Sequence, residues 1–191
     1  MTRHLLAAAA GLCIASAATA ASAATWAIDP AHTNVQFSVR HMMLSNVTGE
    51  FGKVSGSIQG DQAAAASAVI EATIDASSIN TREPKRDEHL KSPDFLDVAK
   101  YPTITFKSKK IEPAGAGSFK VTGDLTLHGV TRPVTLNVVF NGVGPGLMGA
   151  GTRMGFSGVG RIKRSEFNVT GGRPWAGDDV DLQFDVEFVR K

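Results

Sequence analysis

The sequence carries one concentrated cluster of charged residues. The stretch RDEHLKSPDFLDVAKYP, residues 86–102, places His89 among several acidic side chains. A histidine near carboxylates titrates close to neutral pH, so this cluster could perform general acid–base chemistry. Such chemistry also needs a nucleophile or oxyanion donors, and none is recognisable nearby. A short segment with alternating charge signs is more often a solvated face. A structural role is therefore favoured, and catalysis by the Arg86–Asp97 cluster is the alternative.

The other motifs that could bind a metal or a cofactor are weaker. The segment GPGLMG, residues 144–149, fits the glycine pattern of dinucleotide sites, but the residues after it do not predict the helix which that pattern requires. The histidines beyond the N-terminal segment do not form the i,i+2 or i,i+4 pairs that are common in zinc and copper sites. The run His41-Met42-Met43 has a faint copper pattern, yet a polar strand end with core methionines explains it better. The sequence therefore predicts no metal and no cofactor.

The N-terminal residues are typical of a secretory signal peptide. Arg3 precedes a run of apolar residues that is rich in alanine, and Ala21-Ser22-Ala23 forms a small-x-small cleavage site. We expect residues 1–23 to be removed and residues 24–191 to form one domain. The apolar run is short for a membrane span, so no stable span is predicted. Cleavage would remove Cys13, the one cysteine of the chain, and the domain must then be stable without disulfides.

The charge pattern argues against a nucleic-acid partner. The formal net charge is only +2 at pH 7, and the charged residues are scattered along the chain. No long basic run and no interleaving of basic with aromatic residues is found, although nucleic-acid-binding domains usually show one of these patterns.

Alternation of apolar and polar residues is the strongest structural signal. It indicates strands with one buried face and one wet face. Most connections are short and rich in glycine, and residues 128–134 have the composition of a hairpin, so the strands should be antiparallel. Roughly eight segments alternate in this way: residues 35–40, 70–74, 104–108, 119–123, 124–129, 134–140, 153–158 and 178–191.

One segment, residues 80–97, breaks the alternation and predicts a short helical insert. Asn80 or Thr81 could cap this helix, Pro84 is tolerated in its first turn, and Pro93 ends it.

A sheet of about eight antiparallel strands must cover its apolar face. It can pack on a second sheet or close into a barrel, and a closed barrel of eight strands can hold one small ligand. Frequent glycine in the strands and inward residues of mixed size favour a barrel with room inside. A porin-like membrane barrel also alternates, but it needs aromatic girdles, and this chain has only two Trp and one Tyr.

Three long motifs carry a family resemblance. They are IDPAHTNVQFSVRHMMLSNVTGEFGKVSGSI, RDEHLKSPDFLDVAKYPTITFKS and GDLTLHGVTRPVTL, which lie within residues 28–136. Together they resemble the YceI family of periplasmic polyisoprenoid-binding proteins. The resemblance implies an all-β, lipocalin-like barrel of eight antiparallel strands with an elongated apolar cavity for a polyprenyl lipid or an isoprenoid quinone. It also implies a periplasmic location and a loose link to stress responses, and it supplies no catalytic residues.

The residues and the resemblance together give a specific expectation. The protein is expected to bind an apolar isoprenoid rather than to be an enzyme, and edge-strand pairing into a homodimer is left open. The insert should cap the barrel, with Arg86, Asp87 and His89 as structural or head-group contacts at the cavity mouth. The residues expected to line the lipid-binding tube are Phe37, Val39, Ile74, Phe106, Leu125, Leu127, Phe156, Leu182 and Phe184.

Overall fold

The computed structural model describes residues 24–60, 62–146, 149 and 151–191. The expected signal peptide, residues 1–23, lies outside the described residues. The described part contains one α-helix, α1 (Pro84–Lys91), and short 3-10 helices that include η1 (Gln62–Ser67), η2 (Ala76–Ser78) and η4 (Arg164–Phe167). Its strands are β1 (Thr25–His41), β2 (Ser45–Phe51), β3 (Val54–Gln59), β4 (Val69–Asp75), β5 (Ile79–Asn80), β6 (Thr103–Gly115), β7 (Ser118–Leu127), β8 (Val130–Pro145), β9 (Thr152–Lys163) and β10 (Ala176–Arg190).

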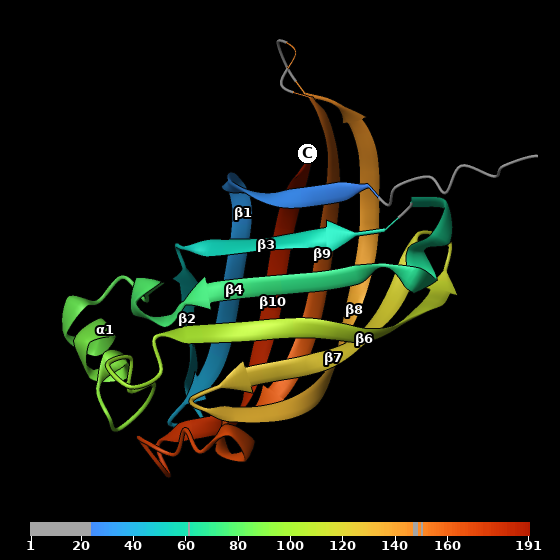
Figure 1. The fold of residues 1–191 in the computed structure, drawn as a ribbon. Coiled ribbons are helices and arrows are strands. Elements are labelled where there is room, and N and C mark those ends of the chain that lie inside the picture. The colour runs from blue at the N-terminus through green and yellow to red at the C-terminus, as the bar shows by residue number, and fades with distance from the viewer. Residues whose placement is uncertain (1–23, 61, 147–148, 150) are drawn as a thin grey trace, which may run out of the picture.

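The strands form one antiparallel sheet that closes on itself. The long strand β1 pairs with β10 along one edge, from Trp26 opposite Arg190 to His41 opposite Ala176. Its other edge is shared by β3 near the start of β1 and by β2 near its end. Because β2 and β3 together occupy one position in the ring, the described residues form a closed barrel of eight strands. In Figure 1, β3, β4, β6 and β7 cross in front of β1, β10, β9 and β8.

The predicted all-β, eight-stranded antiparallel barrel is confirmed, although its strands are not all the predicted ones. The segments 119–123 and 124–129 were predicted as two strands, but they lie within or at the end of the single strand β7, which runs through Gly123. The strand formed by β2 and β3 was not among the predicted segments. The hairpin predicted over 128–134 is present, and its turn uses His128 and Gly129, both with positive φ.

Glycine explains why the strand formed by β2 and β3 escaped prediction. Gly49 lies opposite Phe37 on β1, and a Cβ added to Gly49 would overlap the Phe37 ring. The same arrangement occurs where Gly158 of β9 lies opposite Phe184 of β10. The absence of a side chain at these positions lets the aromatic ring lie flat against the wall. It also removes the apolar residue by which a strand is recognised.

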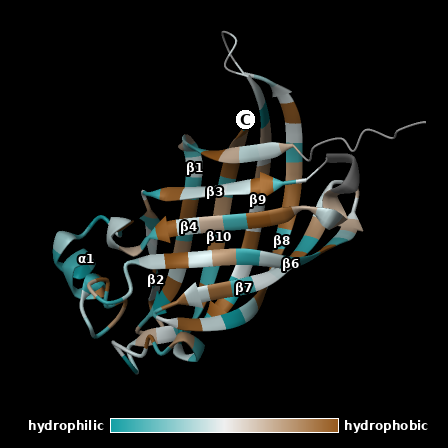
Figure 2. Ribbon diagram, in the orientation of Figure 1, coloured by the Kyte–Doolittle hydropathy of each residue, from teal (hydrophilic) through white to brown (hydrophobic). Residues whose placement is uncertain are grey.

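The inner face of the curved sheet is apolar and its outer face is largely polar. Apolar and polar residues alternate along the strands in Figure 2, and the buried hydrophobic residues come from nearly every strand. The buried residues form clusters at different places in the barrel, for example around Phe167 and around Trp26. The core is therefore distributed along the inner wall.

Substitution of Gly158 by alanine tests the role of the glycine–aromatic contacts. The added Cβ would overlap the Phe184 ring and lie 2.9 Å from the carbonyl oxygen of Asn137. We expect the free energy of unfolding to fall by about 1–3 kcal/mol because the ring must move. Gly144→Ala is the matched control, since no atom lies within 4 Å of its added Cβ, and its effect should stay within about 0.5 kcal/mol. Urea unfolding of the two variants measures the difference, and equal losses would contradict the proposed role of the contact.

Candidate functional site

The inner wall of the barrel encloses an apolar cavity of about 720 Å³. Every strand of the closed ring contributes to its lining, because alternate residues of each strand point inward. All nine residues predicted for the tube lie in this lining, and their role in lipid binding stays a prediction. The nine are Phe37, Val39, Ile74, Phe106, Leu125, Leu127, Phe156, Leu182 and Phe184.

Other lining residues were missed as site candidates for two reasons. Some, such as Leu136, Phe140 and Phe188, belong to predicted apolar faces and could have been named from the same alternation. Others, such as Phe51 and Ile58, lie on β2 and β3, where glycines interrupt the pattern. Polar groups in the lining are few, and they are Gln36, Arg40, His41, Glu71, Arg86, His89, Arg164 and Gln183.

The predicted helical insert lies against the cavity. Its helix, α1, begins after Glu83, whose carboxylate accepts a hydrogen bond from the backbone N–H of Lys85, and Pro84 occupies the first turn. The prediction that Asn80 or Thr81 caps the helix is therefore wrong. Glu83 is an uncommon capping residue, so residue type alone does not indicate its role.

Some charged residues of the insert form hydrogen bonds within it, and some line the cavity. Arg86 donates two hydrogen bonds of 2.8 Å to Thr81, one to its hydroxyl and one to its carbonyl oxygen. The Asp87 carboxylate accepts hydrogen bonds from the backbone N–H and the hydroxyl of Thr81. Thr81 is only 2% exposed and directly follows β5, so these bonds hold α1 against the start of the insert. Arg86 lines the cavity, whereas Asp87 is not among the lining residues.

His89 is an exposed polar residue of the insert that also lines the cavity. Its Nε2 lies 3.0 Å from a carboxylate oxygen of Asp94, and its ring meets the Phe95 ring edge-on, with 5.0 Å between centroids. The side chain is 58% exposed and also belongs to the cavity lining. The arrangement is a solvent-accessible histidine–carboxylate pair at the edge of an apolar cavity.

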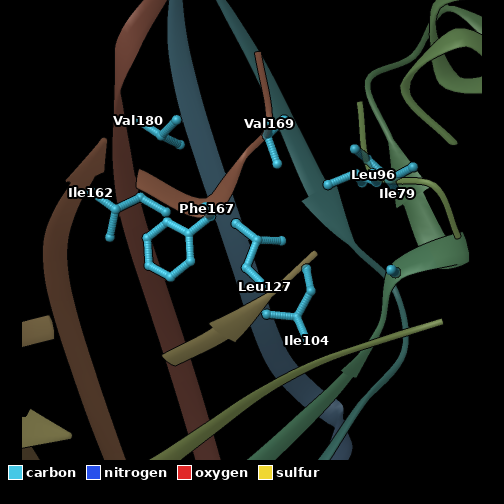
Figure 3. Close-up of a cluster of buried hydrophobic side chains, with 9 residues drawn as sticks. Ile79, Leu96, Ile104, Leu127, Ile162, Phe167, Val169 and Val180 are labelled. Carbon is cyan, nitrogen blue, oxygen red and sulfur yellow. The ribbon is translucent and has the colours of Figure 1, made fainter. Parts of the chain in front are cut away.

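Two segments cover part of one end of the barrel. Leu96 of the insert belongs to the same buried cluster as Phe167 and Val169, which lie between β9 and β10; the cluster also includes residues at the ends of several strands (Figure 3). Phe167 is 1% exposed and is the largest fully buried side chain among the described residues. The insert therefore covers part of the cavity as predicted from its apolar residues.

A buried arginine holds the second of these segments. Arg164 is 5% exposed, and its guanidinium donates to the carbonyl oxygens of residues 169, 171, 176 and 177 at 2.6–3.0 Å. Burial lowers the pKa of Arg164 below its ordinary value. Beside it, hydrogen bonds from Ser165, together with Arg173, hold the pKa of Asp178 at about 2. A cation thus organises the loop between β9 and β10 without a direct carboxylate partner in the described chain.

One group of potential metal ligands is paired with an arginine side chain. Asp29, His32 and Glu187 lie close together outside the cavity lining. The Arg153 guanidinium bonds to both carboxylates, and this contact with Arg153 is the main cause that lowers the pKa of Asp29 to about 2. Together with Arg153, these residues form an ion-pair network that joins β1, β9 and β10.

The methionines after His41 are not in the core. Met42 is 47% exposed and Met43 is 78% exposed, so the interpretation of these residues as core methionines is wrong. The cause is the turn between β1 and β2, which points both side chains away from the barrel wall. No helix within the described residues is long and apolar enough to span a bilayer.

The fold and the cavity define a closed eight-stranded barrel with an apolar interior. The chain belongs to the YceI-like family, whose domain model matches residues 26–188. A UPF0312 protein of Vibrio parahaemolyticus is 38% identical over 186 residues, which cover 95% of this chain and 96% of the relative. A UPF0312 protein of Vibrio cholerae is 38% identical over 174 residues, covering 90% of each chain.

Solved structures share the fold. Burkholderia cenocepacia BcnA superposes with a TM-score of 0.74 and 32% identity, covering 84% of this chain and 98% of that one. The YCEI protein of Campylobacter jejuni gives a TM-score of 0.69 and 37% identity, covering 80% and 89%. A polyisoprenoid binding domain from Saccharophagus degradans gives a TM-score of 0.66 over 87% and 98% of the two chains, but its identity of 18% shows the fold alone.

Replacement of Arg164 by methionine tests the buried cation. The variant keeps an apolar stem but leaves four carbonyl oxygens without their donor. We expect the free energy of unfolding to fall by about 3 kcal/mol or more. Arg161→Met is the control, because Arg161 forms an exposed ion pair with Asp181, and such pairs contribute little to stability. Chemical denaturation of both variants gives the values, and a small loss for Arg164→Met would contradict this account of the loop.

Proposed function

We propose that this protein binds a long apolar isoprenoid, either a polyprenyl lipid or an isoprenoid quinone, inside the barrel. It is exported through the signal peptide at residues 1–23 and acts in the periplasm, where it stores, transports or protects its ligand under stress. The observation that carries the proposal is the apolar cavity of about 720 Å³. Cavities of roughly 300–1,000 Å³ are typical of small-molecule sites.

The energetics of the cavity favour an apolar occupant. The apolar wall around about 720 Å³ offers water few hydrogen-bond partners, so water inside the cavity would be poorly bound. A hydrocarbon chain, in contrast, gains about 0.8 kcal/mol for each buried methylene.

Family and fold support the same ligand class. The chain belongs to the YceI-like family, and the Saccharophagus degradans domain of the same fold is described as polyisoprenoid binding. The wall is continuous, apolar and poor in directional polar groups. Such a wall selects its ligand by length and width, while the few polar groups, including Arg86 and His89, would contact a head group.

Binding rather than catalysis is also favoured by the hydrogen bonds of the insert. The polar groups of Arg86 and Asp87 are bonded to Thr81. The remaining His89–Asp94 pair would need an activated nucleophile or an oxyanion site to modify a lipid. We therefore propose that the protein is not an enzyme, with lipid modification by the Arg86–Asp97 cluster as the alternative.

The ligand proposal predicts an extractable isoprenoid and a thermal shift. Protein purified from its native compartment should release an isoprenoid on solvent extraction, and native mass spectrometry should show the complex. Added polyprenol or quinone at about 100 times its Kd should stabilise the empty protein by about 2.7 kcal/mol, raising Tm by about 5–10 °C.

A cavity-blocking variant sharpens this test. Leu125→Trp places a larger side chain in the cavity wall and should weaken uptake. Val139→Trp is the control, because Val139 is 45% exposed and is absent from the lining. If native protein carried no isoprenoid and refused both added ligands, the proposal would be wrong.

The enzymatic alternative predicts turnover that depends on His89. We expect neither the wild type nor His89→Ala to convert a bound polyprenol or quinone, while both bind it and keep the same Tm to within a few degrees. Mass spectrometry of the ligand after incubation measures conversion, with Asp94→Asn as a second variant of the pair. Conversion by the wild type that His89→Ala abolishes would establish the alternative and overturn the binding-only role.

A further inference from the structure

Two segments distant in sequence form an exposed apolar patch. The backbone N–H of Met42, in the turn between β1 and β2, donates a 2.6 Å hydrogen bond to the carbonyl oxygen of Trp175, just before β10. The side chains of Met42, Met43, Leu44 and Trp175 are here called the turn patch. They are 47%, 78%, 80% and 61% exposed, and they include the three most exposed large hydrophobic residues of the described chain. Figure 1 shows the loop that precedes β10 at the end of the barrel where β1 meets β2.

The turn patch is unfavourable for the folded protein in isolation. Met42 and Met43 have φ of 49° and 60°, and the N–H of Leu44 bonds to the carbonyl oxygen of His41 at 3.0 Å. Turn positions in the left-handed region, such as these two central residues, strongly prefer Asn and Gly. Methionine is strained there. Apolar residues that are both strained and exposed point to a function outside the core.

The turn patch has a cation, Arg40, beside it. The two chain segments that form the patch, residues 39–48 and 168–176, contain no carboxylate of their own. Arg40 is exposed, and its guanidinium bonds to the carbonyl oxygen of Met43 and to the Asn46 side chain. Within the described residues, Arg40 forms no ion pair, whereas Arg173 pairs with Asp178. A tryptophan and aliphatic side chains beside a cation are typical of surfaces that rest at a membrane interface.

The turn patch also borders the cavity. Arg40, His41 and Trp175 belong to the cavity lining and are exposed to solvent as well. The cavity therefore reaches the surface beside the patch. An apolar ligand that left a bilayer at this point would meet the cavity without crossing a long path through water.

We propose that the turn patch is a membrane-docking surface that seats the barrel on a bilayer with anionic head groups. Met43, Leu44 and Trp175 enter the interfacial region, and Arg40 contacts the head groups. Only the purpose of docking, which is ligand exchange with the bilayer, rests on the proposed lipid-binding function.

The test uses residues 24–191 and vesicles of phosphatidylethanolamine with phosphatidylglycerol. The wild type should float with these vesicles, and it should bind less to phosphatidylcholine vesicles or at high salt, because screening weakens the contact with anionic lipid. Trp175 provides a second signal. Trp26, the other tryptophan, is 5% exposed, so in a Trp26→Phe background the emission of Trp175 should shift to the blue when vesicles are added.

One variant separates a docking role from a structural role. Met42→Asn with Met43→Gly creates the sequence that this turn prefers, so it should raise Tm slightly while the vesicle partition coefficient falls by about tenfold. Val139→Ser with Val159→Ser is the control, since these residues are also exposed, at 45% and 52%, and it should bind vesicles like the wild type.

The outcomes distinguish this proposal from the lipid-binding function. Uptake of polyprenol from detergent solution, without vesicles, should be equal in the wild type and the Met42→Asn, Met43→Gly variant. If the wild type took up no polyprenol but still bound vesicles, the lipid-binding function would be refuted and the docking proposal would stand. Failure of the wild type to bind vesicles, or equal binding by the variant, would overturn the docking proposal. The docking proposal would also be overturned if sedimentation measurements showed a dimer for the wild type and a monomer for the variant. The patch would then be a contact between two copies of the chain.

Discussion

The pairing of the first strand with the last is the interaction on which the rest of the structure depends. β1 and β10 join along almost their full lengths, and this joint turns one half-apolar sheet into a closed wall. A closed wall needs no second layer to cover its apolar face, because the face covers itself. The interior is then free to remain open, and inward glycines such as Gly49 and Gly158 keep the aromatic rings against the wall.

The sequence predicted the barrel because period-two alternation is a local signal that survives along each strand. The prediction failed where glycines that make room for side chains of neighbouring strands interrupt the alternation. Gly123 resembled a boundary, yet it lies inside β7 and makes room for the Phe106 ring. Gly49 and Gly56 erased the alternation of β2 and β3. The number of strands was correct because one strand was divided and another was missed.

The ends of the barrel were harder to predict than its wall. Arg164 bonds to carbonyl oxygens up to thirteen residues away, and a periodic pattern contains no information on such contacts. Met42 and Met43 illustrate the opposite error, since apolar type alone suggested a buried position. Their exposure depends on the geometry of a tight turn beside Trp175. The lining of the cavity, in contrast, follows directly from which residues alternate, as all nine predicted residues illustrate.

The order of strands also constrains how the chain reaches its native state. The joint that places Trp26 opposite Arg190 connects residues at opposite ends of the domain, so its contacts have the largest loop entropy to overcome and should form late. Until they form, β1 and β10 present unpaired backbone edges of the kind that recruit strands from other molecules. Loss of β10 would leave β1 and β9 as permanently unpaired edges. Aggregation, rather than a smaller folded barrel, is the expected fate of such a truncated chain.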